Sequence, residues 1–207
     1  MRHWIAALVL ALLALPLTAL AIEEPEFEVV RQLGEVEVRQ YASYVVAEVV
    51  VEGSAQNAGN VAFPILAGYI FGKNKGERKM AMTTPVTQTQ TPKPMKMAMT
   101  APVTQTAVGA THLVQFVLPR SVSLATAPEP LDSRVQLREV AASQVAVIRY
   151  RGLWSASNYE QNLAKLKAAL EGAGLAWTGE PVLSRYDPPL TPGFLRRNEI
   201  WLHLKPV

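Results

Sequence analysis

The fold is decided by residues 36–53, VEVRQYASYVVAEVVVEG, and by their counterpart at residues 135–152, VQLREVAASQVAVIRYRG. Each stretch begins with alternating apolar and polar residues, passes through small residues and ends in a valine-rich segment before a glycine. Period-two alternation and β-branched residues predict two strands in each stretch. A helix is expected after each glycine, so the chain reads as two copies of one unit.

Each copy is completed by a helix and two further strands. Ser54 is expected to cap a helix that runs to about Phe71, and Ser157 with Glu160 forms a capping box for the second helix. The last strands are expected at about residues 181–186 and 198–204. Each half is thus predicted to be β-β-α-β-β. Together the halves predict an α+β fold, a distorted antiparallel β-barrel with two flanking helices.

A shorter repeat lies in the middle of the chain. Residues 79–89, KMAMTTPVTQT, recur as residues 96–106, KMAMTAPVTQT, with ten of eleven positions identical. Two extended segments joined through a proline-rich turn predict a hairpin. Five of the six methionines lie in this region, and they either pack in the core or line a surface for an irregular apolar ligand.

The N-terminus has the features of a secretory signal peptide over residues 1–21. Arg2 and His3 precede an apolar run, and residues 19–21, ALA, form an A-x-A-like cleavage site. The alternative, a retained membrane anchor, has a short uninterrupted apolar run. We expect cleavage after Ala21, a single domain over residues 22–207, a periplasmic or secreted location and no membrane span in the mature chain.

Composition excludes several classes of function. The chain has 207 residues, 49% hydrophobic and 18% charged, with a net charge of +3 and no basic run, so nucleic acid is not an expected partner. The absence of cysteine excludes disulfides, thiolate metal sites and cysteine nucleophiles. His112 and His203 have no metal-ligand spacing, and neither a G-x-S-x-G motif nor a P-loop occurs. Neither a metal site nor an enzyme is expected.

Four motifs together resemble the signature of the SOUL haem-binding protein family. They are residues 69–72, YIFG, residues 96–103, KMAMTAPV, residues 186–189, YDPP, and residues 196–202, RRNEIWL, in the family's order. The resemblance covers the chain from Ile22 onward and points to an exported bacterial member. It implies a distorted β-barrel of two similar halves with two helices outside.

The resemblance also implies a ligand, haem or another tetrapyrrole bound without a covalent link in an apolar groove beside the first helix. The apolar contacts it implies are Val61, Ile65, Leu66, Tyr69 and Ile70 of the helix and Pro189, Leu190 and Phe194 of a facing loop. A propionate needs a charge-assisted donor, and the candidates are Lys73, Lys75, Lys79, Arg196 and Arg197. Structural pairing with Asp187 and Glu199 is the alternative for the two arginines. Candidate iron ligands are Met80, Met82, Met97 and Met99.

Other functions are compatible with the same residues. A tetrapyrrole binder acting as carrier, buffer or scavenger needs no catalytic group. A barrel that binds small effector molecules could instead use Glu199 with Tyr186. A hydrolase on this scaffold would use Glu199 as general acid or base, with Tyr186 or Tyr150 assisting. A protein-interaction role would fall to the hairpin at residues 86–103.

Overall fold

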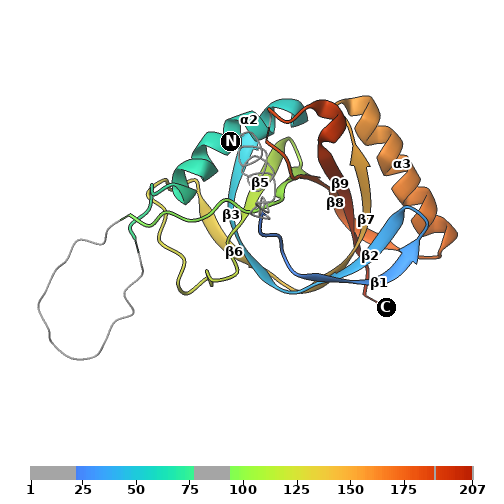
Figure 1. Ribbon diagram of the computed structural model, residues 1–207, viewed down its shortest axis with the longest axis horizontal. Helices are drawn as coiled ribbons and strands as arrows, with labels where there is room; N and C mark the ends of the chain where they lie inside the picture. The colour runs from blue at the N-terminus through green and yellow to red at the C-terminus, as the bar shows by residue number, and fades with distance from the viewer. Residues whose placement is uncertain (1–21, 77–93, 189, 207) are drawn as a thin grey trace, which may run out of the picture.

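The computed structural model describes residues 22–76, 94–188 and 190–206 (Figure 1). The expected signal peptide, Lys79, Met80, Met82 and Pro189 lie outside these residues. The strands are β1 (Phe27–Leu33), β2 (Val36–Tyr41), β3 (Tyr44–Glu52), β4 (Val103–Val108), β5 (Thr111–Val117), β6 (Gln136–Val140), β7 (Ser143–Arg151), β8 (Trp177–Arg185) and β9 (Arg197–Leu204). The helices are α2 (Ala55–Ile70), α3 (Ala156–Gly172) and the short 3₁₀ turn η1 (Gly193–Leu195).

The nine strands form one antiparallel sheet in the order β1-β2-β7-β9-β8-β4-β5-β3-β6. The sheet is strongly curled, and α2 and α3 lie on its outer side (Figure 1). The expectation of an α+β fold with two flanking helices is confirmed, but the sheet is not closed into a barrel, because β1 and β6 end it and do not pair. Strand pairing stops over residues 42–43 and 141–142, where β2 passes into β3 and β6 into β7.

Strand pairing is the same in the two halves. The order β2-β3-α2-β4-β5 is followed by β6-β7-α3-β8-β9, with β1 added in front. β3 pairs with β5 as β7 pairs with β9, and β4 pairs with β5 as β8 pairs with β9. The halves join where β2 pairs with β7, β3 with β6 and β4 with β8. This arrangement is compatible with the predicted duplication of the sequence.

The helices bury one apolar face each against the outer side of the sheet. On α2 the buried face is Ala58, Ala62, Leu66, Tyr69 and Ile70, at helical spacing, and it packs against β3 and β5. On α3, Leu166 and Leu170 pack against β7 and β9. Among the described residues, no helix has the length and apolar character needed to cross a membrane.

Two local expectations are corrected. α3 begins one residue before Ser157, and its N-cap is Ser155, whose hydroxyl accepts a hydrogen bond from the backbone N–H of Asn158. The hairpin expected between the two methionine repeats does not involve β4, because residues 103–106 already pair with β5 on one side and β8 on the other. The first copy of that repeat lies outside the described residues.

Candidate functional site

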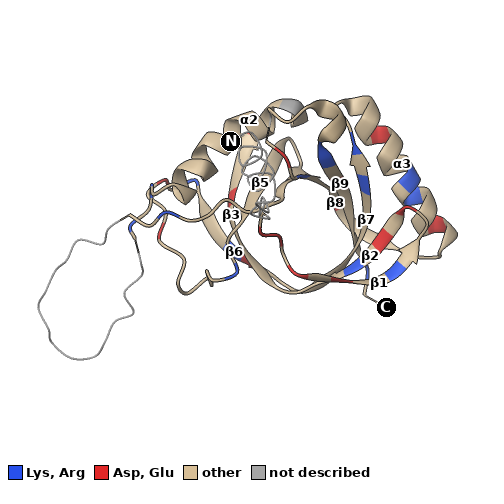
Figure 2. Ribbon diagram, viewed as in Figure 1, with Lys and Arg blue, Asp and Glu red and all other residues tan. Residues whose placement is uncertain are grey.

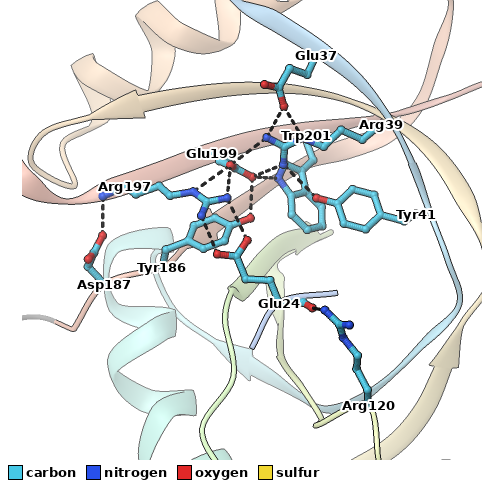
Figure 3. A network of polar contacts seen from close by, with 10 residues as sticks. All are labelled: Glu24, Glu37, Arg39, Tyr41, Arg120, Tyr186, Asp187, Arg197, Glu199 and Trp201. Carbon is cyan, nitrogen blue, oxygen red and sulfur yellow. Dashed lines mark hydrogen bonds and ion pairs between the residues drawn. The ribbon is translucent and has the colours of Figure 1, made fainter. Parts of the chain in front are cut away.

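A buried carboxylate lies at the centre of the inner side of the curled sheet. Glu199 of β9 is fully buried and accepts six hydrogen bonds (Figure 3). Arg39 donates to both carboxylate oxygens, at 2.9 and 3.2 Å, and Arg197 donates twice to Oε1, at 2.8 and 3.2 Å. Tyr186 Oη and Trp201 Nε1 donate to Oε2 at 2.6 and 2.9 Å. Both oxygens are therefore saturated with donors.

Local sequence explains how these side chains meet. Strand alternation points Arg39 and Tyr41 of β2 to the inner side, while Val36 packs under α3 on the outer side. The same alternation places Glu199 and Trp201 on the inner side of β9. Tyr41 stacks on Trp201 with ring centroids 5.0 Å apart. The polar cluster is thus surrounded by aromatic rings.

Glu199 and its hydrogen-bond partner Tyr186 have pKa values shifted in opposite directions. Burial raises the pKa of its carboxyl, but the charges of Arg39 and Arg197 and the hydrogen bonds from Arg39 and Tyr186 outweigh burial, so the pKa lies below its ordinary value. Burial and the charge of Glu199 raise the pKa of Tyr186 well above its ordinary value. Glu199 is therefore ionised and Tyr186 protonated at neutral pH.

The segment before β1 covers this cluster. Figure 2 shows acidic residues concentrated in the chain that leads into β1. Glu24 binds Arg197 with two hydrogen bonds, at 2.7 and 3.1 Å. Glu23 and Glu26 pair with Arg120, and the backbone carbonyl of Glu23 accepts from the N–H of Ala101 at 2.9 Å. Residues 23–26 are thereby fastened across the inner side of the sheet.

This arrangement can hold a charge but has little capacity for proton transfer. A carboxylate with six donors and a lowered pKa is a weak base, and the residues around it leave no unsatisfied acceptor on Glu199. The sequence suggested Glu199 and Tyr186 as residues of an effector or hydrolase site, and in the structure the two side chains are hydrogen-bonded. An effector cation would have to displace Arg39 or Arg197 to reach the carboxylate.

The helix residues expected to contact haem divide into two groups. Val61 is exposed and Ile65 half-buried on α2, so both can meet a ligand outside the helix. Leu66, Tyr69 and Ile70 are 0–1% exposed in the core beneath α2. Their placement in an outer groove is corrected, because the helix turns them toward β3 and β5.

The loop residues are the most exposed apolar side chains nearby. Leu190 is 96% and Phe194 73% exposed, and Leu195 and Leu153 are exposed beside them. Figure 1 shows the segment between β8 and β9 crossing between the N-terminal ends of α2 and α3. We call the following set the outer apolar surface: Val61 and Phe63 of α2, and Leu153, Leu190, Phe194 and Leu195.

The expected propionate partners also divide. Arg197 follows the alternative expected for it, structural pairing: its guanidinium lies on the inner side, bound to Glu24 and Glu199, while its backbone N–H donates to Asp187 at 2.6 Å. Arg196 lies in the β8–β9 segment, donates to the carbonyl of Thr191 at 2.7 Å and stacks over Trp154. Lys73 is exposed at the C-terminal end of α2. Lys75 pairs with Glu129.

Neither described methionine among the candidate iron ligands faces the outer apolar surface. Met97 is 7% exposed within the core under α2, and Met99 packs against the same core. Among the described residues, no group of three or more His, Asp or Glu side chains is placed to hold a metal ion. Met97 and Met99 are therefore not placed to ligate the iron of a tetrapyrrole at the outer apolar surface.

Sequence reasoning missed several residues of these sites. Arg39 was passed over, although a strand with Glu37, Arg39 and Tyr41 on one side and valines on the other signals two buried faces. Trp154 was also missed. Its ring lies under Arg185 and Arg196, and its Nε1 donates to Asn198 at 2.8 Å. No spacing in the sequence links these positions, because the fold brings them together.

Comparison with solved structures shows a shared fold at low sequence identity. The EcmrR C-terminal domain matches with a TM-score of 0.58 and 11% identity, over 83% of this chain and 98% of that chain. A hydrolase from Listeria innocua matches with a TM-score of 0.53 and 12% identity, over 82% of this chain and 91% of that chain. At this identity the likeness concerns the fold alone.

Comparison of sequences identifies the family. Heme-binding protein 1 from Sus scrofa is 26% identical over 141 residues, which is 68% of this chain and 68% of that protein. The Mus musculus protein of the same name is 27% identical over 142 residues, again 68% of each chain. The family model described as SOUL heme-binding protein matches residues 22–203. The chain therefore belongs to the SOUL heme-binding protein family.

Proposed function

We propose that this protein binds haem or a related tetrapyrrole, without a covalent link, on the outer apolar surface. The observation that carries the proposal is the concentration of exposed apolar side chains on α2 and the β8–β9 segment. Six of the fifteen exposed large apolar residues among those described make up this surface. Exposed apolar side chains that gather on neighbouring elements are typical of binding surfaces.

A cation beside this surface supports an acidic ligand. Arg196 lies in the β8–β9 segment itself, whereas Lys73 lies at the far end of α2. A planar macrocycle would pack on Phe194 and Leu190, while a propionate would pair with Arg196. Family membership makes a tetrapyrrole the first ligand to test.

The role we propose is non-catalytic: a carrier, buffer or scavenger. Ionised, fully hydrogen-bonded Glu199 supports this proposal, since the inner cluster offers no free base. We further propose that residues 1–21 direct export and that the tetrapyrrole is met in the periplasm or outside the cell. Fusing residues 1–21 to a reporter enzyme and measuring its activity in the periplasmic fraction tests the export.

Titration with haem, followed by difference absorption, tests the ligand. The expected result is saturation at one haem per chain, with affinity reduced at least ten-fold in Phe194→Glu. Val29→Glu is the matched control, because Val29 is an exposed apolar residue on β1 that does not belong to the outer apolar surface. Uptake that is unsaturable, or that Phe194→Glu and Val29→Glu reduce equally, would reject the outer apolar surface as the site.

A further inference from the structure

A separate cavity lies on the outer side of the sheet, over β4 and β8 and between the N-terminal ends of α2 and α3. Its volume is about 290 Å³. The residues that carry the argument are Gln105 of β4, Leu183 and Arg185 of β8, Tyr150 of β7, and Trp154 and Tyr159 near the start of α3. We call it the inter-helix cavity. Neither Glu199 nor the exposed residues Leu190 and Phe194 line it.

Three residues that line this cavity each have a buried polar atom without a hydrogen-bond partner: Gln105, Arg185 and, through Nδ1, His112. Gln105 is 7% exposed, and its amide nitrogen donates to the carbonyl of Ala55 at 2.8 Å, which fixes the orientation of the amide. The amide oxygen Oε1 is buried and accepts no hydrogen bond. Nε of Arg185 is likewise buried and donates none. A buried polar group without a partner is destabilising, so these atoms point to a missing ligand.

The charge of Arg185 is also uncompensated within the described part of the chain. Its guanidinium lies over the ring of Trp154, 4.7 Å from the centroid, and forms no ion pair with any described carboxylate. Burial, and then the charge of Arg196, lower the pKa of Arg185, while Tyr150 opposes them. Glu160 and Glu180 lie at the exposed rim of the cavity, where solvent screens them.

A glycine keeps the space between these groups open. A Cβ on Gly59 of α2 would lie 2.7 Å from Nη1 of Arg185 and 3.9 Å from Oε1 of Gln105. Glycine inside a helix is destabilising relative to alanine. Gly59 therefore has a local role: it lets the guanidinium and the amide oxygen approach the same point.

We propose that the inter-helix cavity binds a small aromatic carboxylate that carries an N–H donor next to the carboxylate. The carboxylate pairs with Arg185, the N–H donates to Oε1 of Gln105, and the ring lies among Tyr150, Trp154 and Tyr159. The volume is at the lower end of the range for ligand sites, about 300–1,000 Å³. It suits one or two fused rings and is too small to enclose a tetrapyrrole.

Anthranilate, 2-aminobenzoate, is the probe of choice, because it is fluorescent and carries both groups on one ring. Fluorescence titration of the purified protein is expected to saturate at one anthranilate per chain. Benzoate, which lacks the N–H donor, is expected to compete about three- to ten-fold more weakly, the equivalent of one hydrogen bond. Failure of anthranilate to saturate would overturn the proposal.

Two variants tie the binding to the cavity. Gly59→Ala fills the space beside Arg185 and keeps every polar group, and Arg185→Met removes the charge; each is expected to weaken anthranilate at least ten-fold. Gly172→Ala is the matched control, since a Cβ there meets nothing within 4 Å. Equal affinity in Gly59→Ala and Gly172→Ala would overturn the proposal, even if Arg185→Met failed to fold. Haem titrations of the same variants are expected to match the unsubstituted protein.

Discussion

Tyr186, just after β8, donates its phenolic hydroxyl to Glu199 of β9 across 2.6 Å. The two groups have pKa values displaced in opposite directions, lowered for Glu199 and raised for Tyr186. The proton therefore stays on the phenol and the charge on the carboxylate over a wide range of pH. This pair stabilises a fixed arrangement of charges on the inner side of the sheet.

Replacing Glu199 with glutamine is expected to be strongly destabilising. The change leaves the buried guanidinium of Arg39 with only the partly exposed Glu37 as its ion-pair partner, and breaking a buried pair costs about 3–5 kcal/mol. Urea unfolding gives the free energy directly. Glu35→Gln is the control, because Glu35 forms an exposed pair with Lys165 at 3.7 Å, worth about 0–1 kcal/mol. Similar losses in both variants would show that the inner cluster is dispensable.

Stability is expected to fall in acid because of Glu199. Its pKa is lower in the folded chain than the ordinary value of 4.5, so the unfolded chain binds the proton first as pH falls. The contribution is therefore present above about pH 4.5 and is lost as pH falls below it. Urea midpoints between pH 7 and 3 should decline less steeply in Glu199→Gln. An identical slope in both proteins would contradict the assigned charge state.

Stability is expected to fall at high pH because of Tyr186. Its pKa is raised in the folded chain from 10.0, so its contribution is complete below about pH 10 and is lost above it, as the phenol of the unfolded chain ionises. Tyr186→Phe should flatten the loss of thermal stability between pH 9 and 11. Tyr159→Phe serves for comparison and should flatten the loss less, since Tyr159 lies outside the inner cluster and burial raises its pKa by a smaller amount. The prediction fails if both variants lose stability equally.

The segment before β1 is expected to close the inner cluster. Glu24→Gln removes a carboxylate that binds a partly buried Arg197, and we expect a loss of about 1 kcal/mol after allowing for solvent screening. Hydrogen exchange at the indole N–H of Trp201, which donates to Glu199, should accelerate. Glu28→Gln, on the exposed side of β1, should leave that exchange rate unchanged. Unchanged exchange in Glu24→Gln would show that residues 23–26 do not cover the cluster.

The two faces of α2 are expected to respond differently to truncation. Leu66→Ala removes a fully buried side chain and should cost about 2–5 kcal/mol. Val61→Ala, on the exposed side, should change the free energy of unfolding by less than about 0.5 kcal/mol. It should also weaken the binding of haem. Urea unfolding and haem titration on both variants separate the roles. A large stability loss in Val61→Ala would place that residue in the core.

Local patterns predicted most elements of the fold. Alternation predicted β2 and β3, with the break at residues 42–43, and the apolar spacing of α2 predicted its length within a residue or two. The open edge of the sheet between β1 and β6 was not predictable from local patterns, because closure depends on whether these two end strands meet. Ser155 rather than Ser157 caps α3, since both serines satisfy the same local preference and packing decides between them.

The sites were predictable only in part. Glu199 and Tyr186 were singled out by analogy with related folds, and the structure brings the two side chains together. Arg39 comes from a strand 160 residues away in sequence, and local spacing carries no sign of such a contact. Leu66 was misassigned to a groove because a wide apolar stripe does not say which of its edges is exposed. The amide oxygen of Gln105 can be recognised as unpaired only from the structure, because this depends on all the groups that surround it.

The most direct test of where haem binds uses the two buried indole N–H groups as reporters. Trp154 lies beside the β8–β9 segment and donates to Asn198, whereas Trp201 lies on the inner side and donates to Glu199. In ¹⁵N-labelled protein, paramagnetic haem at the outer apolar surface should broaden the Trp154 signal and residues 190–196 while sparing Trp201. Broadening centred on Trp201 and Tyr186, with Trp154 unaffected, would contradict binding on the outer surface.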